Sequence, residues 1–178
     1  MRKILFLFLC AFSILSYAQD VPLEVTKEVN LSKDDLFSKT KMFISDKWNN
    51  PNNSIQNEDK EGGIIQVKTE KEFSINVGMG LKCIYNYEYL TKFRVKDGKY
   101  RIEIYNIKCV SAKQIGLGKE YKIPLIPYFT GNNAPEKLKS AGKGISKKKA
   151  IEMMQELNDE FADIFNQYNQ YINEKDDF

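Results

Sequence analysis

The chain has 178 residues, of which 42% are hydrophobic and 29% are charged, and it carries a net charge of +3 with no histidine. So small a basic excess excludes the electrostatic footprint of a nucleic-acid-binding domain, which needs a basic stripe and a high pI. The lack of histidine removes the commonest general base, the commonest metal ligand and the usual partner of a serine or cysteine nucleophile.

The first 18 residues have the composition of an export signal. Arg2 and Lys3 precede an apolar run over residues 4–15, which is too short to span a bilayer, and a small-x-small sequence follows at 16–18. We expect cleavage after residue 18, which lowers the net charge to +1 and leaves a mature protein in the periplasm or secreted. Residues 19–178 have the length of a single domain and contain no other run long enough to cross a membrane.

The mature chain is expected to begin with a strand and a helix. Residues 24–29 have the pattern of a short strand. Ser32 has the position of a helix N-cap, because acidic residues that suit the helix dipole follow it at Asp34 and Asp35. Apolar residues then recur at helical spacing as far as Trp48, which predicts an amphipathic helix, and residues 49–54 are expected to form a polar loop.

Residues 55–109 are expected to form antiparallel strands. Strands are predicted at 55–59 and from 64 to as far as 77. Asp97-Gly98 then lies between two alternating apolar runs, which is the strongest short-range signal of a β-hairpin. A two-residue loop pairs Val95 with Tyr100 and keeps the large apolar side chains on one face, whereas a three-residue loop would mix the two faces.

The second face of this hairpin is charged at one end and apolar at the other. The register places Arg94 opposite Arg101 at the charged end, and Leu90 opposite Tyr105, with Ile107 beyond, at the other. A fully solvated face would be more polar. We therefore expect another part of the chain to cover the apolar end.

The mature chain has two cysteines, Cys83 and Cys109, in a compartment that favours oxidation. The register places them on opposite faces of the hairpin, where no disulfide forms, and so predicts two buried free thiols. A β-bulge near Asn106 would turn Cys109 to the face of Cys83 and would allow a disulfide, and this alternative stays open.

Helical periodicity returns at the end of the chain. Ser146 is expected to cap a helix of about seven turns, whose apolar residues run from Ile151 to Ile172. The order of strand, helix, antiparallel strands and long helix predicts an α+β fold, in which a curved antiparallel sheet carries both helices on one face.

Three short segments resemble a known family: residues 31–37 (LSKDDLF), 62–65 (GGII) and 96–101 (KDGKYR). They are similar to exported bacterial proteins described as domain of unknown function 4468, and the resemblance covers roughly residues 21–109. The resemblance implies a TATA-binding-protein-like fold and assigns no catalytic residue. The DNA-binding use of that fold does not carry over, because fold does not imply function.

A long connection is expected at residues 110–145. Its middle, residues 123–129, is apolar and stiffened by two prolines, so we expect it to be docked, against the apolar end of the exposed sheet face. Two interpretations stay open: the segment completes a second small core, or it forms a lid over a ligand groove. The candidate ligand-binding residues are Leu90, Tyr105, Ile107, Ile126, Tyr128 and Phe129.

A second candidate site lies at the start of the last helix. Free backbone N–H groups and lysines together make a site for phosphate, a lipid headgroup or an acidic glycan. The alternative is a solvated lysine-rich turn without a ligand. The candidate anion-binding residues are Lys143, Lys147, Lys148 and Lys149.

The sequence contains no catalytic or cofactor motif. Its carboxylates are scattered, its cysteines lack the spacing of a zinc or redox site, and no Walker, Rossmann or calcium-loop pattern occurs. We therefore expect no enzyme, no metal and no cofactor.

The leading hypothesis is an exported module that binds an unknown protein or cell-envelope component, but not nucleic acid, through the open sheet face and residues 110–145. The alternative is a periplasmic carrier of a small apolar or anionic ligand.

Overall fold

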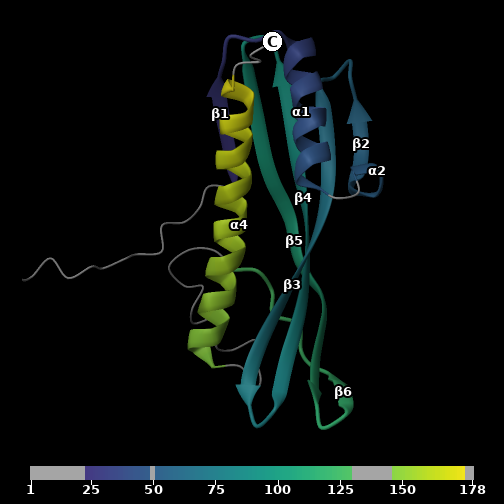
Figure 1. Cartoon of the computed structure of the whole chain (residues 1–178), viewed down its shortest axis with the longest axis vertical. Helices are drawn as coiled ribbons and strands as arrows, with labels where there is room; N and C mark the ends of the chain where they lie inside the picture. The colour runs from purple at the N-terminus through teal and green to yellow at the C-terminus, as the bar shows by residue number, and fades with distance from the viewer. Residues whose placement is uncertain (1–22, 49–50, 130–145, 175–178) are drawn as a thin grey trace, which may run out of the picture.

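The computed structural model of the chain describes residues 23–48, 51–129 and 146–174. Three long strands run the length of the molecule, and the last helix lies along them (Figure 1). The predicted signal peptide, residues 1–18, lies outside the described residues. The elements are β1 (Glu24–Glu28), α1 (Lys33–Lys47), α2 (Pro51–Ser54), β2 (Ile55–Asp59), β3 (Ile64–Gly78), β4 (Leu81–Lys96), β5 (Lys99–Gly116), β6 (Lys119–Lys122) and α4 (Lys147–Asn173).

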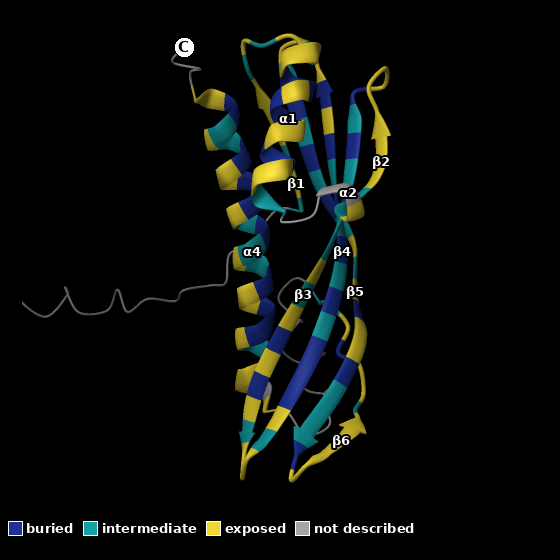
Figure 2. Cartoon of the chain, turned by 45° about the vertical axis from the view of Figure 1, so that its right-hand side comes forward, coloured by how far each residue is buried: buried dark blue, intermediate teal, exposed yellow. Residues whose placement is uncertain are grey.

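The strands form one antiparallel sheet in the order β1-β5-β4-β3-β2, and β6 pairs with β5. Both α1 and α4 pack on the same face, which we call the inner face; the other is the outer face (Figures 1 and 2). Buried and more exposed residues alternate along β3, β4 and β5, as a sheet with one packed face requires (Figure 2). The predicted α+β architecture is confirmed.

Helix α1 begins and ends as its sequence predicts. The Ser32 hydroxyl accepts a hydrogen bond from the Asp35 N–H at 3.1 Å, which satisfies one of the free donors of the first turn. At the other end, Trp48 donates from Nε1 to the Thr69 hydroxyl at 3.0 Å and so joins the helix end to β3. The polar loop expected at 49–54 is partly helical, because α2 occupies its last four residues.

Aromatic rings fill the space between the sheet and the helices α1 and α4 in the part of the molecule that contains β1 and α1, which is the upper part in Figure 1. Tyr168 of α4 is fully buried, and its ring centroid lies 5.1 Å from Phe43, 5.0 Å from Phe93 and 4.9 Å from Tyr100. Its hydroxyl shares a 2.6 Å hydrogen bond with the Thr40 hydroxyl, so the one polar atom of this ring is satisfied. This cluster ties α1 and α4 to each other and to β4 and β5.

The hairpin register is as predicted next to its turn. Val95 pairs with Tyr100 across Asp97-Gly98, and the pairing continues without a shift as far as Leu90 and Tyr105. The two-residue loop therefore sets both faces of the upper sheet.

Farther from the turn, two β-bulges shift the register. One lies at Asn106, which has a φ of +54°, and the other at Val110; each adds one residue to β5. Glu88 consequently pairs with Lys108 rather than with Ile107, and Ile107 packs against the core. The expectation that Ile107 continues the outer face is therefore wrong.

The first bulge also turns Cys109 to the inner face, the face of Cys83, so the expected placement on opposite faces is wrong. Both thiols are buried and free, as predicted. Cys83 pairs with Gln114, whereas Cys109 pairs with Tyr87, four residues farther along β4. That separation of roughly 13 Å along the strand exceeds the span of a disulfide.

The first part of the expected connection at 110–145 is a second hairpin. β5 continues to Gly116, and a turn at Leu117-Gly118 leads into β6. The sequence gives little warning of this turn, because Leu117 has a φ of +51°, in the left-handed region that leucine rarely adopts. In the described part of the chain, no helix combines the length and the apolar character of a membrane span.

Candidate functional site

Residues 123–129 dock on the inner face, between the lower part of the sheet and α4. Ile126 is fully buried, and its carbonyl accepts a hydrogen bond from the Tyr87 hydroxyl. The Tyr128 ring packs edge-on against Phe161 of α4, with 5.9 Å between the ring centroids. The expectation that this segment is docked is confirmed, but the expected location on the outer face is wrong.

The structure separates the six candidate ligand-binding residues into two groups. Leu90 and Tyr105 stay opposite each other on the outer face, half-buried and outside the core cluster. The other four belong to the core or pack against it, and they are Ile107, Ile126, Tyr128 and Phe129. The six residues therefore do not line one groove.

Paired charges occupy the middle of the outer face. The Glu88 carboxylate lies 2.8 Å from the Lys68 ammonium and 3.5 Å from that of Lys108, which joins β3, β4 and β5. The hydrogen bond from Lys68 lowers the pKa of Glu88 and raises that of Lys68, so both stay charged over the physiological range. The lysines are held in place and are not freely extended into solvent.

A second group of charges lies nearer the hairpin turn. Arg94 and Arg101 face each other directly, as predicted, which is unfavourable for like charges. The Glu103 carboxylate offsets this, since it lies 3.3 Å from Arg94 and 2.9 Å from Arg101, and Glu24 of β1 also pairs with Arg101. The Arg101 Nε atom is buried and has no hydrogen-bond partner among the described residues.

Tyr105 supplies the aromatic surface of the outer face. The Lys92 ammonium lies 5.0 Å from its ring centroid, within cation–π range. A groove of about 470 Å³ runs beside this ring and reaches Leu23 and Glu24 of the neighbouring edge. Sequence reasoning found the ring and its partner Leu90 but not the groove, because the position of β1 beside β5 was not predicted.

A second hollow, of about 360 Å³, lies at the hairpin end of the same face. Thr26 and the backbone around Gly62 form its walls. Four cationic residues line it, namely Arg94, Lys96, Lys99 and Arg101. The outer face therefore offers an aromatic ring, planar guanidinium groups and two shallow hollows side by side.

Burial suppresses the reactivity of the tyrosines and cysteines that the structure describes on the inner face. Burial raises the pKa of Tyr100 to about 12 and raises the pKa values of the other core tyrosines, so their hydroxyls stay neutral. Burial likewise raises the pKa values of Cys83 and Cys109, which keeps both in the unreactive thiol form. No cluster of metal-ligating side chains occurs in the described ranges.

The candidate anion site at the start of α4 is described only in part. Lys143 and the side chain of Lys147 lie outside the described residues. The ammonium groups of Lys148 and Lys149 lie 3.9 Å and 3.7 Å from the Glu152 carboxylate, so a carboxylate of the chain itself neutralises part of their charge. Binding of an anion here stays a prediction.

Comparison with known proteins finds a family match in the first part of the described chain. Residues 24–109 match the model of a family described as "Domain of unknown function (DUF4468) with TBP-like fold". This part of the chain is similar in sequence to that family. Residues 24–109, which we call the DUF4468 segment, run from β1 to the part of β5 between its two bulges. The match confirms the resemblance seen in the sequence. No curated protein matches the chain.

The solved structures similar to this chain include two bacterial proteins. A DUF4468 family protein from Bacteroides ovatus ATCC 8483 is 14% identical, with a TM-score of 0.52 over 87% of this chain and 88% of that chain. A TBP-like protein from Parabacteroides distasonis ATCC 8503 is 19% identical, with a TM-score of 0.49 over 82% of this chain and 90% of that chain. The first similarity extends beyond the DUF4468 segment, and at this identity it shows the fold alone.

Proposed function

We propose that this protein is an exported, non-enzymatic module that binds another protein or a cell-envelope component through the outer face of its sheet. The observation that supports the proposal is the outer face itself. In the described part of the chain, α1, α4 and residues 123–129 all pack on the inner face. Tyr105 and the groove beside it therefore lie on the face of the sheet that these elements do not cover.

The composition of this face is typical of a recognition surface. Tyrosine and arginine are among the residues most enriched where protein interfaces gain their energy, and this face carries Tyr105, then Lys92, then the pair Arg94 and Arg101 along the hairpin. The Glu103 carboxylate pairs with both arginines, which restricts the positions of their side chains. Side chains that are already ordered lose less conformational entropy when a partner binds.

Residues 110–145 take a smaller part in this proposal than the sequence suggested. The apolar residues 123–129 pack in the core, and β6 adds a short strand beside β5. A carrier of an apolar ligand would need the space beneath residues 123–129, which Ile126 and Tyr128 occupy. The arrangement therefore favours a binding module over a carrier.

Export is part of the proposal and is supported by the sequence of residues 1–18. The two cysteines are compatible with an oxidising compartment. Cys109 of β5 pairs with Tyr87, four residues from Cys83 on β4, and this separation is too large for a disulfide between the two thiols.

Photo-crosslinking tests the proposed surface. A photoreactive amino acid replaces Tyr105 in the full chain, which is expressed in its own cells, and a matched variant carries it at Met42, a half-exposed position on α1. We expect a discrete adduct from position 105 and none from position 42. The absence of an adduct at 105, or the same adducts from both positions, would overturn the proposal.

A further inference from the structure

Two large apolar side chains stand exposed at the tips of neighbouring hairpins. Met79, in the β3–β4 turn, is 94% exposed, and Leu117, in the β5–β6 turn, is 90% exposed. The two turns adjoin, because a Cβ atom at Gly116 would lie 3.4 Å from the Gly80 carbonyl oxygen. Both turns lie at the end of the molecule opposite β1 and the last turn of α4 (Figure 1).

Neither residue suits its backbone conformation. Met79 has a φ of +52° and Leu117 a φ of +51°, a left-handed conformation that glycine, asparagine and aspartate adopt far more readily. Because both side chains are exposed, neither gains burial energy that would offset the strain. The two-residue loops require a positive φ at both positions, so the turns explain the backbone conformation but not the choice of an exposed, large apolar residue there.

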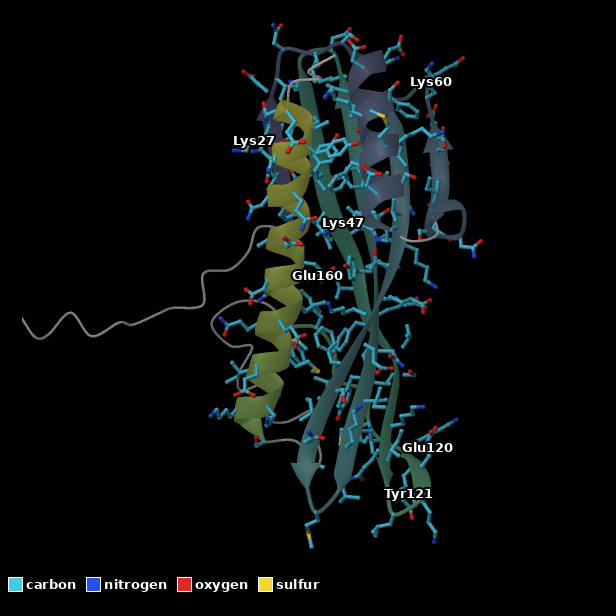
Figure 3. The ribbon with its side chains drawn as sticks, viewed as in Figure 1. Lys27, Lys47, Lys60, Glu120, Tyr121 and Glu160 are labelled. Atoms are coloured by element: carbon cyan, nitrogen blue, oxygen red, sulfur yellow. The ribbon has the colours of Figure 1, made fainter. Side chains whose placement is uncertain are left out.

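Basic residues surround the tips. Residues 76–87 and 111–126, all of them described, contain four lysines, at 82, 113, 119 and 122, and Glu120 as their sole acidic residue. Glu120 pairs with Lys113 at 3.1 Å, which leaves an excess of positive charge. Half-exposed Tyr121 lies beside Glu120 on β6 at the same end (Figure 3). The start of α4, with its lysines, lies toward this end as well (Figures 1 and 2).

We propose that this end docks on the surface of an anionic lipid bilayer, with Met79 and Leu117 inserted at the level of the headgroups and upper acyl chains. Exposed apolar side chains gain free energy there, and each nearby lysine is attracted by anionic headgroups. Tyr121 suits the boundary, because tyrosine prefers the interface between membrane and water.

The shape and charge of the tips favour a membrane over a protein partner. The two apolar side chains protrude from turns, and a fluid bilayer accepts them without a preformed pocket. The lysine excess is complementary to a negatively charged surface. The tips lie apart from the groove beside Tyr105, so this surface does not depend on the proposed function.

Vesicle co-sedimentation tests the inference. The mature protein is mixed with vesicles of phosphatidylcholine alone or of phosphatidylcholine and phosphatidylglycerol in equal parts. We expect binding to the anionic vesicles, weakening as salt is added because salt screens the lysines. No binding to the anionic vesicles would overturn the inference, including the case in which the tips bind another protein instead.

A double variant, Met79→Asn with Leu117→Asn, separates membrane binding from folding. Asparagine tolerates the left-handed backbone, so the variant should unfold at a temperature no lower than the wild type. Its affinity for the anionic vesicles should fall roughly tenfold or more, because both apolar anchors are lost. The control Met42→Gln, which removes an exposed methionine from α1, should bind as the wild type does. Equal binding by the double variant and the wild type would contradict insertion of the tips.

Discussion

On the inner face, β3, β4 and β5 present aromatic and aliphatic side chains that pack against α1, α4 and residues 123–129. On the outer face, the same three strands present charges that pair with one another around Glu88 and Glu103. Alternation along a strand thus gives one backbone two surfaces with different energetics. Each large side chain buried on the inner face contributes about 1.5–3 kcal/mol, whereas an exposed ion pair contributes about 0–1 kcal/mol. The inner face therefore provides most of the stability, and the outer face is available for the recognition role that we propose.

The largest contrast is expected between two tyrosines. Tyr168→Ala removes the ring at the centre of the inner aromatic cluster and should lower the free energy of unfolding by about 3–5 kcal/mol. Tyr105→Ala on the outer face should lower it by less than about 1 kcal/mol. Urea denaturation measures both values. Similar losses from the two variants would mean that the outer face is also part of a packed core.

Neighbouring residues of the docked segment give the next contrast. Ile126 is fully buried, whereas Leu125 is half exposed. Ile126→Ala should lower the free energy of unfolding by about 2–5 kcal/mol, and Leu125→Ala should change it by no more than about 0.5 kcal/mol. A neutral Ile126→Ala variant would indicate that the segment is not docked, which would restore the carrier hypothesis.

Alkaline pH tests the burial of the inner tyrosines. Tyr100 keeps its proton up to a pKa of about 12 in the folded protein, whereas in the unfolded chain it ionises near its usual value of 10.0. Its contribution is therefore fully present below pH 10 and is lost as the pH rises toward 12.

The variant Tyr100→Phe isolates this effect. At neutral pH it should cost about 0.5–1.5 kcal/mol, because the 2.8 Å hydrogen bond to Asn169 is lost. Above pH 10, the free energy of unfolding of the variant should fall less steeply with pH than that of the wild type. The difference between the two slopes should reach up to about 1.4 kcal/mol per pH unit. Parallel curves for the two proteins would show that Tyr100 is not protected from ionisation.

The smallest effect is expected on the outer face. Glu103→Gln removes the carboxylate between Arg94 and Arg101 and should lower the free energy of unfolding by about 1 kcal/mol or less. The difference should shrink when salt is added, since these charges are partly exposed. Thermal unfolding at low and high salt provides the measurement, and a large loss that salt does not change would contradict a solvated outer face.

The upper half of the fold could be predicted because several signals agree there. The Asp97-Gly98 turn and the alternation on both sides of it specify one register, and that register holds as far as Leu90 and Tyr105. The caps at Ser32 and Ser146 mark the helix starts in the same local way. Where turn chemistry and periodicity point to the same structure, sequence reasoning is sufficient.

The lower half could not be predicted because its deciding features leave little trace in the sequence. Tyr105, Ile107 and Cys109 keep an unbroken period of two, so nothing in the pattern shows that the bulge at Asn106 moves the last two to the other face. The apolar composition of residues 123–129 predicts docking but does not specify a face. The Leu117-Gly118 turn lacks the usual residue at its first position.

Lysine labelling tests the functional division between the faces most directly. Lys108 on the outer face and Lys41 on α1 form a matched pair: their side chains are 53% and 47% exposed, and each pairs with one glutamate. Both are labelled with an amine-reactive reagent in purified protein and in intact cell envelopes. We expect Lys108 to become protected in the envelope while Lys41 is labelled equally in both settings. Equal labelling of Lys108 in the two settings, or protection of Lys41 alone, would contradict the outer face as the binding surface.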